Sequence, residues 1–246
     1  MISRAVLRRP GPDFAQGITT ASHGAPDYSL LLAQHAAYAD ALRSLGLAVE
    51  VLDALPGFPD AYFVEDVAVV TPDLAVIARP GAPSRLGEED GIDEVLAWHR
   101  EIARIEAPGT LDGGDVLVAD RHVFVGLSAR TNREGAEQLA RRLKPHGYRV
   151  TTVPVSTGLH LKSGVSFIGG RTMLATKQLA RYFHEHQYRC IVAEEAACNT
   201  VLVNDTLLVP SGSAGAVAQA GLRVVELDVS EARKMDGGLS CLSLRF

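Results

Sequence analysis

Four short segments of the sequence carry carboxylates, one imidazole and one thiol beside glycine-containing turns. Each directly precedes or opens a pair of short apolar runs that predicts a β-hairpin. Whether these side chains can act together depends on whether the fold brings the four segments to one place. The segments are residues 60–66 with Asp60, Glu65 and Asp66, residues 111–115 with Asp112, residues 158–163 with His160, and residues 236–241 with Asp236 and Cys241.

A pocket lined by these side chains would be negatively charged and would need a cation. Two carboxylates 4 Å apart repel by about 4 kcal/mol at an effective dielectric constant of 20. A metal ion relieves that repulsion, and so does a guanidinium group, whose planar donors match paired carboxylates. The thiol favours a guanidinium, because a thiolate is a strong nucleophile and histidine carries protons near neutral pH. We predict that Cys241 attacks a guanidinium carbon, with His160 as general acid and base, through a covalent thiouronium.

Each of these residues also has an ordinary structural interpretation. Cys241 can be a small buried residue of a C-terminal strand. His160, between two leucines, can be a hydrogen-bonded core histidine, and Asp112 can cap the Gly113-Gly114 turn. The catalytic interpretation therefore rests on the convergence of the four segments.

The elements that must position the four segments repeat as a hairpin, a helix and a strand. Five such units at roughly 45-residue spacing predict a five-bladed, pseudo-symmetric ββαβ propeller of the α/β class. We expect one domain over residues 1–246, with its last unit closed by pairing of the chain termini. A ring gathers one end of every unit near its axis, where a polar pocket can form. An ordinary α/β sandwich is the alternative.

The boundaries of the predicted units follow from alternating apolar runs and from helical spacing. The predicted hairpins are 67–70 with 74–78, 115–119 with 122–126, 164–170 with 172–176, 200–204 with 207–211, and 240–246 with 2–9. The predicted helices are 88–100, 132–144, 177–187, 213–221 and 27–46, followed by strands 102–107, 148–155, 190–195, 223–229 and 47–53.

Composition limits the partners and the location. A formal net charge of -5 without a stripe of Lys and Arg argues against nucleic acid as a partner. No apolar run approaches the roughly 20 residues of a membrane span, and the N-terminus lacks a secretory signal, so we expect a cytoplasmic protein and no membrane partner. The three cysteines, Cys190, Cys198 and Cys241, have neither disulfide nor zinc-site spacing, and we expect no metal and no cofactor.

Six segments closely resemble the dimethylarginine dimethylaminohydrolases, of the guanidino-group modifying superfamily that includes arginine deiminases and amidinotransferases. The resemblance extends over residues 2–245. It implies the pentein-type fold, a five-bladed ββαβ propeller, in agreement with the period of the elements. The matching segments are FVEDVAVV (63–70), ARPGAPSR (78–85), TLDGGDVLV (110–118), VGLSARTN (125–132), VPVSTGLHLKS (153–163) and MDGGLSC (235–241).

The resemblance also implies a role for each matching residue. Cys241 is the nucleophile, His160 the acid and base, and Asp112 the residue that orients the histidine. Asp66, with Asp60 and Glu65, binds the cationic nitrogens of the substrate and supports the pocket. The remaining implied contacts are Arg85 and Arg130 to the α-carboxylate, the backbone of Met235 beside Asp236 to the α-amino group, and Ile18 in the covering loop 11–25.

The resemblance implies hydrolysis of Nω-methylated or dimethylated L-arginine to L-citrulline and methylamine or dimethylamine. The expected partner is this small-molecule substrate, and a homodimer stays open. An arginine deiminase-like hydrolase is the first alternative, but the chain lacks the extra helical module of typical arginine deiminases. The second is an amino-acid-binding sensor that does not turn its ligand over.

Overall fold

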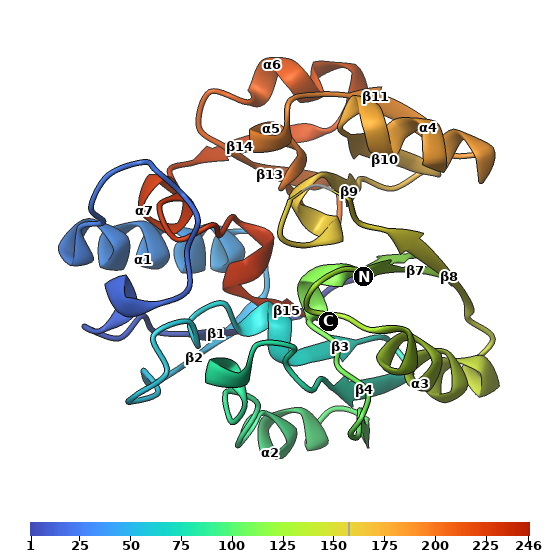
Figure 1. Ribbon diagram of the computed structural model, residues 1–246. Coiled ribbons are helices and arrows are strands. Elements are labelled where there is room, and N and C mark those ends of the chain that lie inside the picture. The colour runs from blue at the N-terminus through green and yellow to red at the C-terminus, as the bar shows by residue number, and fades with distance from the viewer. Residues whose placement is uncertain (157) are drawn as a thin grey trace.

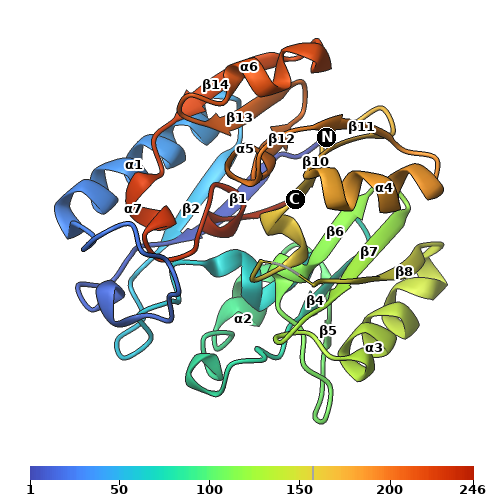
Figure 2. The same ribbon diagram turned by 45° about the horizontal axis from the view of Figure 1, so that its top comes forward.

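The computed structural model describes residues 1–156 and 158–246, and these form five three-stranded sheets around a common centre (Figure 1). Each sheet consists of an antiparallel pair and a third strand that runs parallel to one strand of that pair. The longer helices lie at the rim of the ring, outside the sheets (Figure 2). The predicted five-bladed ββαβ architecture is confirmed.

The five blades are, in chain order, β15-β1-β2, β3-β4-β5, β6-β7-β8, β9-β10-β11 and β12-β13-β14. Their strands are β1 (Arg4–Arg8), β2 (Ala48–Leu52), β3 (Ala68–Val70), β4 (Leu74–Ile77), β5 (Glu101–Arg104), β6 (Val116–Ala119), β7 (His122–Leu127), β8 (Arg149–Pro154), β9 (Val165–Phe167), β10 (Thr172–Ala175), β11 (Arg189–Val192), β12 (Val201–Val203), β13 (Thr206–Pro210), β14 (Arg223–Leu227) and β15 (Leu244–Arg245). The helices are α1 (Tyr28–Ser44), α2 (Ile92–Ala97), α3 (Arg133–Leu143), α4 (Lys177–Glu185), α5 (Glu195–Cys198), α6 (Ala214–Val217) and α7 (Ser230–Arg233).

Both ends of the chain build the first blade, as predicted. β1 pairs antiparallel with β15, with Val6 opposite Leu244, and parallel with β2. The C-terminal strand is shorter than the predicted 240–246, because Ser240–Leu242 forms a 3-10 helix instead. Cys241 therefore lies in a helical turn and not in a buried strand.

The helices begin near their predicted residues, with one marked exception. α1 starts after Asp27, whose side chain accepts a hydrogen bond from the Leu30 amide at 2.8 Å, the geometry of an N-cap. α2 is much shorter than the predicted 88–100. Gly87 and Gly91 on its N-terminal side have φ angles of +105° and +77°, which a right-handed helix does not admit.

The four polar segments of the sequence meet at the centre of the ring. Each contains or abuts a short 3-10 helix before a hairpin, and neighbouring members of this set contact one another. We call these four elements the hub turns, and α5 takes the same place before the fifth hairpin. Convergence, on which the catalytic interpretation rests, is thus observed. The hub turns are Val64–Val67, Gly113–Asp115, Leu161–Ser163 and Ser240–Leu242.

Apolar clusters fill the space between neighbouring blades and beneath the helices. One cluster joins α1 to the first and fifth blades through Leu7, Leu31, Tyr38 and Leu42, all at most 1% exposed. Among the residues that the structure describes, no helix has the length and apolar character needed to span a bilayer.

The close packing of the hub turns generates a testable prediction at Gly113. A Cβ atom at this position would lie 2.0 Å from the backbone oxygen of Glu65 in the adjacent hub turn. We expect Gly113→Ala to lower the free energy of unfolding by about 1–3 kcal/mol, because neither backbone can yield freely. Urea denaturation followed by circular dichroism measures this loss.

Gly215→Ala in α6 is the matched control, since nothing lies within 4 Å of the added methyl group. Alanine is favoured over glycine in a helix, so this variant should unfold at or above the wild-type urea concentration. Equal midpoints for the wild type and Gly113→Ala would show that the hub turns are loosely packed.

Candidate active site

One pocket at the hub collects nine of the residues singled out in the sequence. The lining comes from three hub-turn regions, from the loops after β4 and β7, and from the N-terminal loop. It comprises Ile18, Asp60, Phe63, Asp66, Arg85, Arg130, Leu159, His160, Met235, Asp236, Gly237 and Cys241. Of the predicted site residues, Asp112 and Glu65 lie outside this lining.

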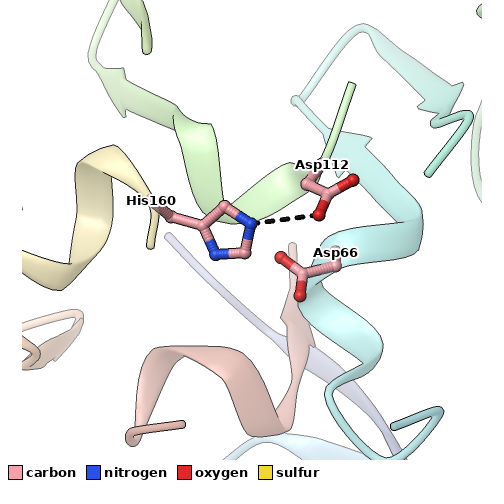
Figure 3. Close-up of side chains that lie close together, drawn as sticks. All are labelled: Asp66, Asp112 and His160. Atoms are coloured by element: carbon pink, nitrogen blue, oxygen red, sulfur yellow. Dashed lines mark hydrogen bonds and ion pairs between the residues drawn. The ribbon is translucent and has the colours of Figure 1, made fainter. Parts of the chain in front are cut away.

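Asp112 supports the pocket from behind through His160. The Nε2 atom of His160 lies 3.0 Å from Oδ2 of Asp112 (Figure 3). The other carboxylate oxygen of Asp112 accepts a hydrogen bond from the Gly81 amide at 2.8 Å, so the fully buried carboxylate is fixed at both ends. Because Asp112 occupies Nε2, the Nδ1 atom of His160 is the one left to exchange a proton with a reacting group.

The surroundings of His160 favour its charged form. Burial by itself lowers the pKa of His160, but the nearby carboxylates of Asp66, Asp112 and Asp115 outweigh burial and raise this pKa to about 9. Figure 3 shows the carboxylates of Asp66 and Asp112 facing the imidazole. At neutral pH, His160 therefore starts as an imidazolium and can act as an acid.

Cys241 has the opposite tendency. Burial, together with the negative charges of Glu65 and Asp66, raises the pKa of the Cys241 thiol to about 12. The free thiol is therefore protonated at neutral pH before a ligand enters. A cation placed between the thiol and these carboxylates would lower that pKa, since an opposite charge favours the ionised form.

Asp66 remains ionised at the floor of the pocket. Its Oδ2 atom lies 2.8 Å from Nη1 of Arg85, and its Oδ1 accepts a hydrogen bond from the Gly114 amide at 2.8 Å. Burial raises the pKa of Asp66, but His160, Arg85 and the Gly114 amide together bring it down to about 2.

Asp66, Asp112 and His160 also form a group with the donors of a metal site, since one ligand atom from each lies within 4.8 Å of the others. These atoms are already engaged with one another and with Arg85, Gly114 and Gly81. An imidazolium has no lone pair to offer a metal. The group is better matched to an organic cation with hydrogen-bond donors.

Glu65 ties three blades together instead of lining the pocket. One oxygen lies 2.6 Å from Nζ of Lys162 and 3.0 Å from Nη2 of Arg245. The other accepts a hydrogen bond from the hydroxyl of Ser240 at 2.8 Å. Since Glu65 lies outside the pocket lining and binds Ser240, it supports the turn that carries Cys241.

Arg85 and Arg130 both line the pocket, but their guanidinium groups differ. Nη1 of Arg85 binds Asp66, and its Nε and Nη2 bind one oxygen of buried Glu88 at 2.9 and 2.7 Å. Nη1 of Arg130 is buried without a hydrogen-bond partner among the described residues, and its closest carboxylate oxygen, on Asp112, is 3.9 Å away. Arg130 is thus the arginine with donors left for an anion.

Two carboxylates fasten the N-terminal loop over the pocket. Asp60 accepts a hydrogen bond from the Ile18 amide at 3.0 Å, and Asp236 accepts one from the Thr20 amide at 2.5 Å and one from the Thr20 hydroxyl at 3.0 Å. The predicted covering loop, Ile18, Asp60 and Asp236 therefore do lie together. Met235 is buried beside them.

Several residues that shape the site were missed by the sequence analysis. Glu88 lies inside the stretch predicted as helix, where a charged residue is unremarkable. Lys162 and Ser128 lie within the matching segments, so their place in those motifs was the available signal. The residues missed are Glu88, Ser128, Lys162, Ser240 and Arg245 as polar supports, and Thr19 and Thr20 in the loop.

The charge state of His160 predicts how stability depends on pH. The pKa of His160 rises from 6.5 to about 9 on folding, so the imidazolium stabilises the fold fully below pH 6.5. That contribution, on the order of 3 kcal/mol, should disappear as the pH rises through 9. We expect urea midpoints to fall over this interval in the wild type and to change less in His160→Gln. Parallel curves for the two proteins would contradict the assigned charge.

Comparisons with known proteins agree with this geometry. The sequence profile of the family described as "N,N dimethylarginine dimethylhydrolase, eukaryotic" matches residues 25–195. The chain is 38% identical over 254 residues to the N(G),N(G)-dimethylarginine dimethylaminohydrolase of Pseudomonas aeruginosa, and the match covers 100% of both chains.

Two solved structures have the same fold over their whole length. A cysteine-to-serine variant of the Pseudomonas aeruginosa enzyme in complex with citrulline matches with a TM-score of 0.95 and 37% identity, covering 100% of both chains. A histidine-to-glycine variant of a dimethylarginine dimethylaminohydrolase, an adduct with S-methyl-L-thiocitrulline, has a TM-score of 0.96 at 37% identity and the same coverage. With its thiol, imidazole and carboxylates gathered on one pocket of this fold, the chain belongs to the dimethylarginine dimethylaminohydrolase family.

Proposed function

We propose that the chain hydrolyses Nω-methylated and Nω,Nω-dimethylated L-arginine to L-citrulline and methylamine or dimethylamine. The observation that carries this proposal is the meeting of Cys241, His160 and Asp66 at one pocket. Citrulline in the complex of the Pseudomonas aeruginosa relative supports the identity of the product. The adduct of a second relative with S-methyl-L-thiocitrulline is in keeping with covalent chemistry at this type of site.

The substrate itself activates the nucleophile. Its guanidinium group binds beside Asp66 and Asp60, whose carboxylates accept hydrogen bonds from the nitrogens and fix their plane. The added positive charge lowers the pKa of Cys241, and the thiol gives its proton to solvent while His160 stays an imidazolium. The thiolate attacks the guanidinium carbon, so an S–C bond forms and a tetrahedral adduct results.

His160 then carries protons in both halves of the reaction. As an imidazolium it gives a proton to the methylated nitrogen, the C–N bond breaks, and the amine leaves a thiouronium on Cys241. Neutral His160 next takes a proton from a water molecule that attacks the same carbon. The C–S bond breaks, the hydroxyl proton passes to the departing sulfur or to solvent, and citrulline is released. Asp112 keeps the imidazole oriented and stabilises its charged form throughout.

The amino-acid end of the substrate binds to the other side of the pocket. Arg130 supplies a free hydrogen-bond donor for the α-carboxylate. Arg85 contributes its positive charge from the side of the guanidinium that Asp66 and Glu88 do not contact. The backbone of Met235 accepts from the α-amino group, and Ile18 closes the loop over the ligand.

A binding protein without turnover would have no use for a thiol beside an imidazolium. We also place the enzyme in the reducing cytoplasm, where its three thiols stay free.

Cys241→Ser tests the reaction. We expect this variant to keep its circular dichroism spectrum and to lose citrulline formation by roughly 10³-fold or more, because a hydroxyl is a poorer nucleophile at a weakly electrophilic carbon. Cys190→Ser, which changes a thiol outside the pocket, is the control and should retain wild-type activity. Mass spectrometry of the released amine distinguishes dimethylamine and methylamine from the ammonia of an arginine deiminase. Full activity in Cys241→Ser would end the proposal.

The two arginines should respond differently to alanine. Arg130→Ala should raise KM by about 10- to 150-fold, the loss of one charge-assisted interaction, with little change in stability. Arg85→Ala leaves buried Asp66 and Glu88 without their cation and should lower the free energy of unfolding by about 3–5 kcal/mol. Kinetics and urea denaturation of both variants measure the contrast. An unchanged KM in Arg130→Ala would remove this residue from the substrate site.

A further inference from the structure

We propose that buried Asp115 and half-buried Ser128 form a positioning unit that holds the proton carrier His160 and the anion-binding Arg130 in place together. Neither residue lines the pocket. Both connect directly to the backbone segments that carry the two functional side chains. This inference rests on the proposed function, since it assigns the unit to the same reaction.

Asp115 links the hub turns of the third and fourth blades. Its side chain is fully buried, and its Oδ1 atom accepts a hydrogen bond from the Leu161 amide at 2.9 Å. Leu161 directly follows His160, so this bond fixes the backbone at the base of the imidazole. The second oxygen, Oδ2, accepts a hydrogen bond from the Ser128 hydroxyl at 2.6 Å.

Ser128 connects Asp115 to the loop that carries Arg130 by hydrogen bonds. Its hydroxyl oxygen accepts hydrogen bonds from the amides of Arg130 at 3.0 Å and of Thr131 at 3.2 Å. The hydroxyl of Thr131 in turn accepts a hydrogen bond from the Asp112 amide at 3.1 Å. The chain of contacts thus begins next to His160, runs along the backbone of Arg130 and returns to the partner of His160.

The loop has no room to compensate for a lost contact by shifting toward the second blade. A Cβ atom on Gly81 would lie 2.0 Å from the backbone oxygen of Arg130, so the two backbones already touch. Without the Ser128 hydroxyl, the amides of Arg130 and Thr131 and the carboxylate of Asp115 would each lose one hydrogen bond. The expected response is rotation of the loop and displacement of the Arg130 guanidinium, whose Nη1 atom has no hydrogen-bond partner among the described residues and lies 3.9 Å from Asp112.

Asp115 has an electrostatic effect as well. Its charge is one of those that raise the pKa of His160 above the ordinary value. The groups facing Asp115 are His160, the hydroxyls of Ser128 and Thr131, and the Leu161 amide. Replacing the carboxylate by an amide of the same shape should therefore shift the alkaline limb of the pH–rate profile to lower pH, a change that a purely structural residue would not cause.

The decisive experiment compares Ser128→Ala with Ser166→Ala. Ser166 also has a hydrogen-bonded hydroxyl and lies outside the pocket lining; it donates to the Cys198 carbonyl at 2.6 Å and accepts from the Thr200 amide at 3.2 Å. Both variants should lower the urea midpoint. Only Ser128→Ala should raise KM for dimethylarginine, by about tenfold, a change equivalent to one lost hydrogen bond.

A double variant separates positioning from general weakening. If Ser128 acts through Arg130, then the double variant should have the same KM as Arg130→Ala alone, since the effects of coupled residues are not additive. Independent, additive effects, or equal KM values for Ser128→Ala and Ser166→Ala, would overturn the inference. A wild type that makes no citrulline would instead refute the proposed function.

If Ser128→Ala does not fold, Asp115→Asn tests the same positioning unit independently. We expect this variant to lower the pH above which kcat falls by about one unit, the size expected when one neighbouring charge is removed. Thr131→Val, which preserves shape but removes the acceptor of the Asp112 amide, should raise KM in the same direction as Ser128→Ala. An unchanged pH profile in Asp115→Asn and an unchanged KM in Thr131→Val would together refute the unit.

Discussion

The structure depends on keeping several carboxylates buried beside one another at the centre of the ring. Glu65, Asp66, Asp112 and Asp115 are each at most 4% exposed and come from two neighbouring blades. Their mutual repulsion is tolerable only because fixed donors surround each of them: lysine and arginine at Glu65, arginine at Asp66, imidazole at Asp112, and amide and hydroxyl at Asp115. These pairs join blades to one another, so the same contacts that close the ring also build the pocket.

This arrangement sets the resting charge of the reacting groups. Negative charge holds a proton on His160 and equally holds one on Cys241, because both proton-bearing forms lower the net negative charge of the hub. In the proposed reaction, a cationic substrate lowers the pKa of Cys241 and so favours the thiolate. The imidazolium of His160 remains available as an acid. Since the thiolate is the reactive form of cysteine, we expect protonated Cys241 to react slowly with oxidants and alkylating reagents until a cation binds beside it.

Carboxylates also hold the binding side of the pocket in place. Asp60 and Asp236 hold the covering loop by accepting from its amides, and Arg85 is held by two carboxylates, so its geometry is rigid before a ligand binds. Nη1 of Arg130 is buried without a hydrogen-bond partner in the described part of the chain, 3.9 Å from Asp112. A buried cationic donor without a hydrogen-bond partner costs free energy that an anionic ligand can recover, and this supports the proposal that Arg130 binds the carboxylate of the amino acid.

The sequence alone determined the repeat and the closure through the termini, and it singled out the candidate reacting groups, because alternation, turn residues and motif spacing are local properties of the chain. It also placed the four polar segments before hairpins, from which their convergence follows by symmetry. Only the tertiary structure decided that Cys241 lies in a helical turn, that α2 is short, that Glu65 joins blades, and that Arg85 is occupied while Arg130 is free. Those outcomes depend on pairs such as Glu65 with Arg245, 180 residues apart. Whether a buried charge is matched by a partner from another blade is a property of three-dimensional packing, and no local pattern encodes it.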